Sequence, residues 1–336
     1  MDNKEIIRKR MKDLLAKGAT MVAPGEKITN GRPTGRQAII IGVQEKVSLK
    51  ELRTVDIIPK TLDGVETDVI VFHKVDILPP KVMAANVRTS RNRPLFGGIS
   101  CGNGELVTAG TILGRVWKGG LAYACTNWHV GGMNEGKIGD LMWQPGHYDG
   151  GTAADATKPI VFKPEVILGG GPIPSDCPIG GAVAMIPNLL ARMMRSRTRL
   201  VPIRPQAEGE NLVDLCLFGP FDESELTDEI YEIGHVDTRN WRDFAVGDIG
   251  EKSGRTSAVN SFDTQFIHAL VNVGLGGTQF AIFSDVDIFG PGAEGGDSGS
   301  GILHPDNYIG SLLFAGSDLN TIGCAWRNVR KVGGLD

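Results

Sequence analysis

The sequence lacks the features that usually mark a membrane protein, a secreted protein or a nucleic-acid-binding protein. Nowhere do eighteen apolar residues run together, so no membrane-spanning helix is expected. The N-terminal stretch "MDNKEIIRKRMKDLLAKG" has no uninterrupted apolar core, so it is not a signal peptide, and we expect a cytoplasmic protein. The net charge is only −4, which gives no reason to expect nucleic acid or an anionic membrane as a partner.

Cysteine is scarce and shows no pairing pattern. The five cysteines are odd in number and widely spaced, and no two form a CxxC pair, so we expect reduced core residues rather than disulfides. His147 and Asp149 are close together in "PGHYDGG", but no HExxH motif and no third ligand accompany them. We therefore expect a polar turn there, and no metal or cofactor. The cysteines are Cys101, Cys125, Cys177, Cys216 and Cys324.

Aromatic residues are also few, at 6%, whereas glycine is abundant, with 46 of 336 residues. Many of these glycines separate short apolar segments, which is the pattern of numerous short strands joined by turns. The hydrophobic content of 41% is enough for one large or two ordinary domains with apolar cores. The composition therefore predicts a mainly β protein.

The start of the chain is predicted to form a separate N-terminal unit. Residues 3–16 carry apolar side chains at helical spacing, which predicts an amphipathic helix packed on the body of the protein. β-Branched runs predict strands at 37–44 and near 66–73, with a short helix at 48–53 between them, so that this part forms a small α/β segment. Residues 78–94 have the polar, proline-rich character of a linker, and we place a domain boundary at its end.

Residues 95–336 are predicted to form short strands separated by glycine turns. "GTILGRVW" and "LAYACTNW" predict a hairpin across "KGG", and similar runs continue almost to the end of the chain. This regular spacing favours a closed barrel or a pair of barrels. At about residues 178–199, helical apolar spacing predicts a helical insertion on the barrel surface. Its arginines form a solvated face or a patch for a protein partner: Arg192, Arg195, Arg197 and Arg199.

The stretch "AEGGDSGSGI", residues 293–302, places Ser298 between an acid and a glycine in a run of glycines. Ordering so many glycines costs backbone entropy, so the run calls for a reason. It is either a simple turn or a tight loop that presents a serine oxygen and bare backbone N–H groups to a substrate. A serine hydroxyl becomes a nucleophile only when a base lies within hydrogen-bond reach and an acid orients that base.

His129 and Asp214 are the best candidates for the base and the acid. His129 follows an apolar strand in "YACTNWHVGG", whereas the other five histidines lie in ordinary strands or polar loops. Asp214 lies among apolar neighbours in "NLVDLCLFG", where an ionised carboxylate needs a specific partner. Asp176 is the second candidate, and the polar surroundings of Asp237 and Asp243 make them weaker ones. Spacing alone does not show that these residues converge.

Three segments, in the order histidine, aspartate and serine, resemble the trypsin-like (chymotrypsin-fold) serine peptidases: "TNWHV", "NLVDLCL" and "GGDSGSGI". "EKSGRTSAVNSF" and "YIGSLLFAGS" resemble further strands of that family, and the similarity is greatest to a bacterial or phage branch with an N-terminal α/β segment. The resemblance covers about residues 95–330 and implies a double β-barrel. It also implies a serine endopeptidase in which Ser298 attacks the peptide carbonyl, His129 transfers the proton and Asp214 orients the imidazole.

The resemblance further implies where a protein or peptide substrate would bind. The backbone N–H groups of Gly296 and Ser298 would form the oxyanion hole, for which glycines leave room. The strand "LLFAGS" would pair with an extended substrate through main-chain hydrogen bonds. The implied substrate contacts are Pro291, Gly292, Phe314, Ala315 and Gly316.

The preferred substrate side chain is harder to infer. Neither Pro291 nor Gly292 carries a charge, which argues against a preference for Lys or Arg. An acid that lines the pocket would overturn that expectation, and the candidates are Asp285, Asp287 and Glu294.

The chain also departs from the family pattern. Asn127 and Trp128 stand where many relatives have small residues, and we expect Trp128 to shape the cleft. In the best-known secreted members a freed N-terminus pairs with the acid before the serine, which here is Asp297. Because Arg93 precedes Pro94, cleavage in "RNRPLFGGIS" is not expected, and we predict that Asp297 holds its loop through local hydrogen bonds.

Two other functions compete with a peptidase. A catalytically inactive binding or scaffold module would keep the trypsin fold and hold a protein partner through the cleft, the N-terminal segment or the helical insertion. An esterase of the α/β-hydrolase type would need a glycine two positions after the serine, and Ser300 stands there instead. Labelling of Ser298 by a fluorophosphonate would separate the module from the enzyme.

Overall fold

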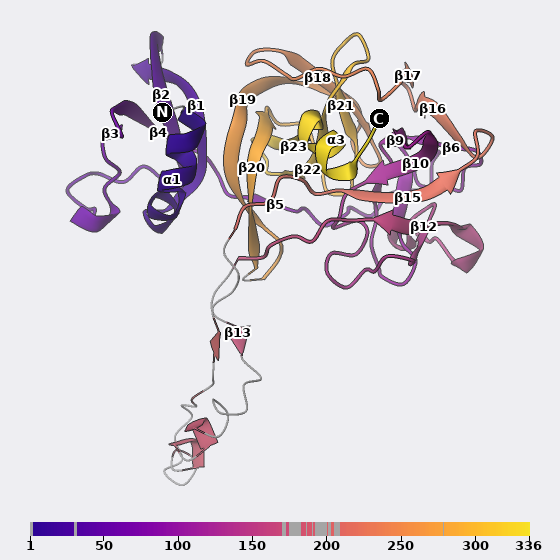
Figure 1. The fold of residues 1–336 in the computed structure, drawn as a ribbon, viewed down its shortest axis with the longest axis horizontal. Helices are drawn as coiled ribbons and strands as arrows, with labels where there is room; N and C mark the ends of the chain where they lie inside the picture. The colour runs from indigo at the N-terminus through magenta and orange to yellow at the C-terminus, as the bar shows by residue number, and fades with distance from the viewer. Residues whose placement is uncertain are drawn as a thin grey trace.

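Most strands of the protein belong to two curled sheets, as the computed structural model shows (Figure 1). The structure describes residues 3–29, 32–169, 209–277 and 279–336, with short pieces between 170 and 208. Within these residues one sheet has seven strands and the other has eleven, which confirms the predicted mainly β fold class. The short pieces are residues 173–174, 183–185, 187–189, 191, 200 and 203–204.

Six strands of the larger sheet close into a barrel, here called the second barrel, and the curled seven-stranded sheet is called the first barrel. The six strands are joined by antiparallel pairing in the order β18, β21, β22, β23, β20 and β19, and β19 pairs back onto β18. Closure leaves these strands without a free edge over their paired lengths. Their bounds are β18 (Ile249–Gly254), β19 (Ala258–Gly274), β20 (Phe280–Phe289), β21 (Gly301–Leu303), β22 (Ile309–Gly316) and β23 (Thr321–Ala325).

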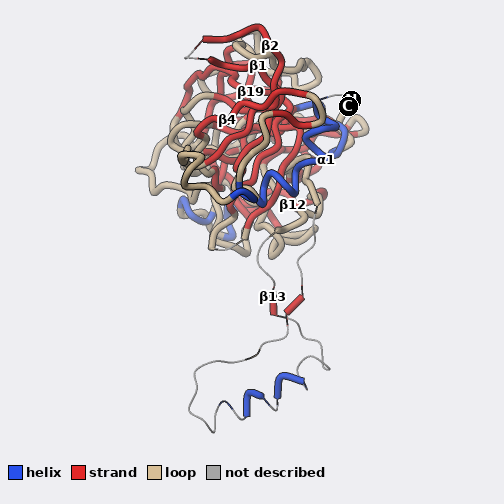
Figure 2. The backbone as a smooth tube through the Cα atoms, turned by 90° about the vertical axis from the view of Figure 1, so that its left-hand side faces the viewer, coloured by secondary structure: helices blue, strands red, loops and turns tan. Residues whose placement is uncertain are grey.

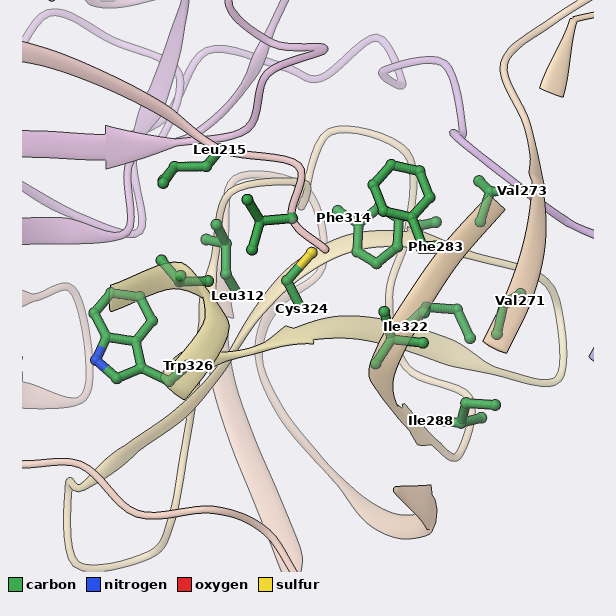
Figure 3. Packing of buried hydrophobic residues seen from close by; sticks show 14 of the residues in the cluster. Leu215, Val271, Val273, Phe283, Ile288, Leu312, Phe314, Ile322, Cys324 and Trp326 are labelled. Atoms are coloured by element: carbon green, nitrogen blue, oxygen red, sulfur yellow. The ribbon is translucent and has the colours of Figure 1, made fainter. Parts of the chain in front are cut away.

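The larger apolar core is shared by this barrel, the seven-stranded sheet and the N-terminal strands. Phe283 and Phe314 face each other inside it, with ring centroids 4.6 Å apart (Figure 3). The helix α3 (Trp326–Gly333) follows β23 directly and adds Trp326, which is 1% exposed, to the same cluster. The sequence interpretation had no helix at this end of the chain.

The seven-stranded sheet carries the predicted hairpin. Lys118 pairs with Leu121, and the two residues between them are Gly119 and Gly120, both with positive φ (57° and 74°), as a two-residue hairpin turn requires. The order of strands is β8, β7, β11, β12, β15, β10 and β9. Their bounds are β7 (Ser100–Asn103), β8 (Gly110–Thr111), β9 (Gly114–Lys118), β10 (Leu121–Thr126), β11 (Leu141–Trp143), β12 (Ala156–Phe162) and β15 (Cys216–Phe221).

The N-terminal strands extend the larger sheet. Met21 of β1 pairs with Val271 of β19, so β1, β2 and β4 lie beside the second barrel (Figures 1 and 2). The predicted helix is present as α1 (Asn3–Ala16), and its apolar face is buried. The predicted boundary at residue 94 stays a prediction. The strands are β1 (Ala19–Thr29), β2 (Arg32–Val43), β3 (Thr61–Leu62) and β4 (Val65–Val71).

Two local predictions for this region were wrong or incomplete. Residues 48–53 form turns rather than a helix, and Leu49 is 66% exposed, so no apolar face packs there. The strand β1 was not expected, because Pro24 and Gly25 are both unfavourable in strands. Pro24 is tolerated because β1 pairs with β19 only at Met21 and Val22, which leaves Pro24 paired on one side alone.

The remaining elements connect the sheets. The predicted insertion at about 178–199 and its four arginines lie mostly outside the described residues, although residues 183–185 and 187–189 within it are helical. Asp176 and Cys177 also lie outside them. No helix among the described residues is long and apolar enough to cross a membrane. These elements are η1 (Thr54–Asp56), β5 (Val75–Asp76), β6 (Leu95–Gly97), η2 (His147–Asp149), η3 (Ala153–Asp155), β13 (Ile173–Pro174), β14 (Ile203–Arg204), β16 (Leu226–Ile230) and β17 (Gly234–His235).

The four described cysteines are buried and free, in agreement with the expected reduced core residues. Burial raises the pKa of Cys101 to about 12 and also raises the pKa of Cys216 well above its ordinary value, so both carry a neutral thiol at neutral pH.

Candidate active site

His129 and Asp214 meet through the pairing of two strands. β10 pairs with β15 so that Thr126 lies opposite Cys216, and the two candidates lie a few residues beyond this pair. The His129 ring nitrogen Nδ1 is 2.8 Å from Asp214 Oδ2, and the His129 backbone N–H donates to Oδ1 at 3.2 Å. Asp214 is 0% exposed and His129 is 9% exposed. The carboxylate therefore fixes both the position and the tautomer of the imidazole.

A third group supports this pair. Asn127 Nδ2 donates to the backbone oxygen of Asp214 at 2.7 Å, and Asn127 is 0% exposed. The backbone N–H of Asp214 is directed at Cys324 Sγ, 3.3 Å away. The main chain on either side of the carboxylate is thus held from both barrels. Neither Asn127 nor Cys324 was assigned such a role from the sequence.

Ser298 lies on the loop between β20 and β21 of the second barrel, and its backbone contacts β8 of the first barrel. The Thr111 N–H, on β8, donates to the Ser298 backbone oxygen at 2.7 Å. A Cβ placed on Gly110 would lie 2.3 Å from Val130 Cγ2 and 2.8 Å from that same oxygen. Ser298 and Val130, the residue after His129, therefore lie against the same glycine, Gly110.

The hydroxyl of Ser298 does not bond to the imidazole. Its Oγ donates weakly to the Phe314 backbone oxygen, 3.5 Å away, and Ser298 is 6% exposed. Hydrogen bonds between a catalytic serine and its histidine are often long or misaligned without a substrate, and they tighten in the complex with substrate. A rotation about the Ser298 Cα–Cβ bond redirects Oγ without moving the backbone.

The glycine loop leaves two backbone donors free. Among the hydrogen bonds of the described chain, the N–H groups of Gly296 and Ser298 have no acceptor, whereas that of Asp297 donates to Glu294 at 2.9 Å. Gly296 has φ of +104°, and a Cβ there would lie 2.5 Å from Thr256 Oγ1. Glycine is therefore required at 296 by both its conformation and the close contact.

Hydrogen bonds to two carbonyl groups set the direction of these free donors. The Gly295 oxygen accepts Thr256 Oγ1 at 2.9 Å and the Lys81 N–H at 3.1 Å. The Asp297 oxygen accepts the N–H and Oγ of Ser300, at 3.0 and 2.7 Å. In a trans peptide the N–H group points opposite to the C=O group. These contacts therefore turn the N–H groups of Gly296 and Ser298 away from the body of the protein.

A buried ion pair between the two barrels supports Thr256. The Arg255 guanidinium contacts Asp149, with Nε 2.6 Å from Oδ2, and their side chains are 0% and 2% exposed. Arg255 Nη1 also donates to Thr256 Oγ1 at 2.9 Å, which leaves the Thr256 hydroxyl proton for Gly295. The expected polar turn is present as η2, but its Asp149 carboxylate is buried against this arginine, which the sequence did not indicate.

Asp297 is held by more than local hydrogen bonds. Lys252 Nζ lies 2.9 Å from Asp297 Oδ2, and Asp297 also accepts the N–H groups of Thr256, Ser257 and Glu294. Burial works to raise the pKa of Asp297, but the charge of Lys252 and these donors outweigh it, and the pKa lies below its usual value. Burial lowers the pKa of Lys252, against the attraction of Asp297. No pattern in the sequence singles out Lys252.

A pocket of about 620 Å³ adjoins this loop. Gly292 lines it together with Glu294 and Asp318, whereas Pro291 is exposed and is not part of the lining. The remaining candidate acids lie elsewhere: Asp285 pairs with His268 and Arg327, and Asp287 with Ser311.

The predicted substrate strand is present as β22, but its three predicted contact residues are not equally accessible to a substrate. Phe314 and Ala315 have buried side chains, so only their backbone can contact a substrate. Gly316 is already paired with Asp76 of the N-terminal segment, in antiparallel register. Trp128 is 1% exposed within the core cluster, so the expectation that it shapes the cleft was wrong.

The chain resembles chymotrypsin-like bacterial serine proteases in its fold. A glutamic-acid-specific serine protease matches with 15% identity and a TM-score of 0.44, over 72% of this chain and 98% of that one. Thermobifida fusca protease A matches with 14% identity and a TM-score of 0.44, over 72% and 96%. Cellulomonas bogoriensis chymotrypsin matches with 15% identity and a TM-score of 0.43, over 72% and 96%.

No family model matches the chain, and no curated protein matches it. At the identities of the solved structures, the likeness concerns the fold alone. The chemistry of the candidate site therefore rests on its own contacts.

Proposed function

We propose that this protein is a serine endopeptidase that hydrolyses peptide bonds through an acyl-enzyme intermediate. The observation that carries the proposal is the 2.8 Å contact between His129 Nδ1 and the fully buried carboxylate of Asp214, beside a loop that presents Ser298 and two free N–H groups. Solved structures of similar fold are serine proteases, which agrees with a hydrolase of this kind.

In the proposed mechanism, Asp214 accepts a hydrogen bond from the Nδ1–H group of His129, so that Nε2 carries no proton and acts as the base. Ser298 Oγ turns from the Phe314 oxygen to Nε2, gives up its proton and bonds to the carbonyl carbon of the substrate. The negative charge on the former carbonyl oxygen is stabilised by the N–H groups of Gly296 and Ser298, each worth about 3 kcal/mol in sites of this type.

The imidazolium then protonates the leaving amine, and the C–N bond breaks to give the acyl-enzyme and the free amine product. A water molecule gives one proton to Nε2 and attacks the ester carbonyl, and the imidazolium returns this proton to Ser298 Oγ as the C–Oγ bond breaks, which releases the carboxylic acid product. Asp214 stays ionised throughout and stabilises the imidazolium. An extended peptide would present its backbone to the edge of β22 and one side chain to the pocket lined by Gly292 and Glu294.

The test is fluorophosphonate labelling followed by cleavage of a peptide library. Wild-type protein is expected to incorporate the probe at Ser298 and to cleave peptides, and Ser298→Ala to do neither. Ser224→Ala, which removes an exposed hydroxyl from the turn between β15 and β16, is the matched control and should retain both activities.

The alternative is an inactive binding module with the same fold. The observation that favours it is the Ser298 hydroxyl, which contacts the Phe314 oxygen rather than His129. This alternative would be supported if folded wild-type protein incorporated no fluorophosphonate and cleaved no peptide of the library.

A further inference from the structure

Residues 76–81, here called the strap, run across the pocket beside the nucleophile loop. Asp76 pairs with Gly316, and the Ile77 N–H donates to the Gly274 oxygen at 2.9 Å. At the other end the Lys81 N–H donates to the Gly295 oxygen at 3.1 Å. Leu78, Pro79, Pro80 and Lys81 all line the pocket.

The strap competes directly with an extended peptide. Strand addition to β22 requires free backbone groups at its end, and Gly316 is that end. β5 already uses this position, so a substrate cannot pair with Gly316 until Asp76 leaves.

The nucleophile loop is shaped to receive the strap. A Cβ placed on Gly295 would lie 1.8 Å from the Pro79 oxygen, 2.8 Å from the Pro79 carbonyl carbon and 3.4 Å from the Leu78 carbonyl carbon. All three nearest atoms belong to the strap, so the missing side chain at 295 is what lets the strap lie against the loop. Gly295 carries no positive φ, so its backbone conformation alone does not require glycine.

The two ends of the strap are held unequally. Val75, just before it, is 1% exposed and belongs to the core cluster of the second barrel. Lys81 pairs with Glu294 at 2.9 Å, but these side chains are 57% and 44% exposed, and surface pairs of this kind contribute little. The exposed end can therefore release while Val75 stays anchored.

We propose that the strap is the resident occupant of the substrate groove, and that it must swing away from Gly316 and Gly295 before an extended peptide can bind. This inference rests on the proposed peptidase function of the same site. Because the Lys81 ammonium pairs with Glu294 in the lining of the pocket, we expect the substrate to place a basic side chain at Glu294.

The test measures binding rather than cleavage, in a Ser298→Ala background. The probe is a fluorescein-labelled peptide with the sequence of residues 74–83, KVDILPPKVM, followed by fluorescence anisotropy. Ile77→Pro, which removes the N–H that holds the strap to the Gly274 oxygen and leaves the loop unchanged, is expected to tighten binding about tenfold. Lys81→Glu, which sets two carboxylates against each other, should tighten it about two- to fivefold. A scrambled peptide should bind weakly to every variant.

Lys158→Glu is the matched control, because Lys158 forms a similar exposed pair with Glu225, at 3.0 Å, in the other sheet. It should leave peptide binding unchanged. Equal binding by the Ser298→Ala parent, Ile77→Pro and Lys81→Glu would overturn the strap proposal.

Labelling of Ser298 in the otherwise wild-type chain tests the peptidase proposal separately. Tighter peptide binding by both variants without any labelling supports the strap and overturns the peptidase. Labelling of Ser298 together with equal peptide binding by the parent and both variants supports the peptidase and overturns the strap.

Discussion

Lys252 and Asp297 form an ion pair beneath the nucleophile loop, with 2.9 Å between Nζ and Oδ2 and with neither side chain exposed to solvent. Lys252 also donates to the Ala258 backbone oxygen at 3.1 Å, so its charge joins the β18–β19 turn to the residue before Ser298. The pair is internal to the chain and requires no freed N-terminus. It therefore gives the loop its shape as soon as the barrel has closed.

Lys252→Met is expected to lower the free energy of unfolding by about 3–5 kcal/mol, because it leaves a buried carboxylate without its counter-charge. Urea unfolding measures the change. The same substitution at the exposed Lys158 should cost less than about 1 kcal/mol. A Lys252→Met protein as stable as the wild type would show that Asp297 is satisfied by its hydrogen bonds alone.

Thr256→Val is expected to reduce kcat about tenfold with little change in KM. The hydroxyl that fixes the Gly295 carbonyl is lost, so the Gly296 N–H is no longer held toward the developing oxyanion, and a tenfold change is about 1.4 kcal/mol of barrier. Steady-state kinetics on a cleaved peptide provide the measurement. Thr256→Ser keeps the hydroxyl and should restore most of kcat. Equal losses in the valine and serine variants would contradict this role.

Asp287 should make stability depend on pH. Burial raises the pKa of Asp287 to about 7, against its hydrogen bond with Ser311. The raised pKa favours the folded state below the unfolded pKa of about 4, and this stability is lost as the pH rises from about 4 through about 7.

Asp287→Asn, which cannot ionise, is therefore expected to be more stable than wild type at pH 8, by on the order of 3 kcal/mol, and to flatten the profile between pH 4 and 7. Unfolding in urea at a series of pH values gives both curves. Parallel curves for the two proteins would mean that Asp287 does not titrate in this range.

Trp128→Phe tests whether this side chain belongs to the core or to the cleft. Because Trp128 is buried in the core cluster, the smaller ring should lower the free energy of unfolding by about 1–3 kcal/mol. The order in which library peptides are cleaved should not change. A changed order of preference with unchanged stability would place Trp128 at the cleft after all.

The local patterns of the sequence were informative where one element determines its own structure. The helical spacing of residues 3–16 and the two glycines after Lys118 predicted α1 and the β9–β10 hairpin, since both depend on neighbours in the chain. The helix expected at 48–53 failed, because no partner surface covers its apolar residues. β1 was missed, because its pairing with β19 and β2 outweighs the poor strand propensity of Pro24 and Gly25.

Some residues of the candidate site could likewise be predicted from the sequence, and others could not. Apolar neighbours marked Asp214 as a buried acid in need of a partner, and the glycine run marked the loop around Ser298. No comparable sequence feature indicated Arg255 or Lys252, because an isolated basic residue in a strand or turn is usually solvated. Their roles depend on Asp149 and Asp297, which lie more than forty positions away in the chain.

The order of amino acids by itself determined a β-rich chain, a glycine loop able to expose backbone donors, and the residue types suited to acyl transfer. Only the tertiary structure decided that His129 contacts Asp214, that Lys252 neutralises Asp297, and that residues 76–81 lie over Gly316 and Gly295. The physical reason is range: propensity and turn chemistry act within a few residues, whereas these contacts form only when barrel closure brings distant strands together.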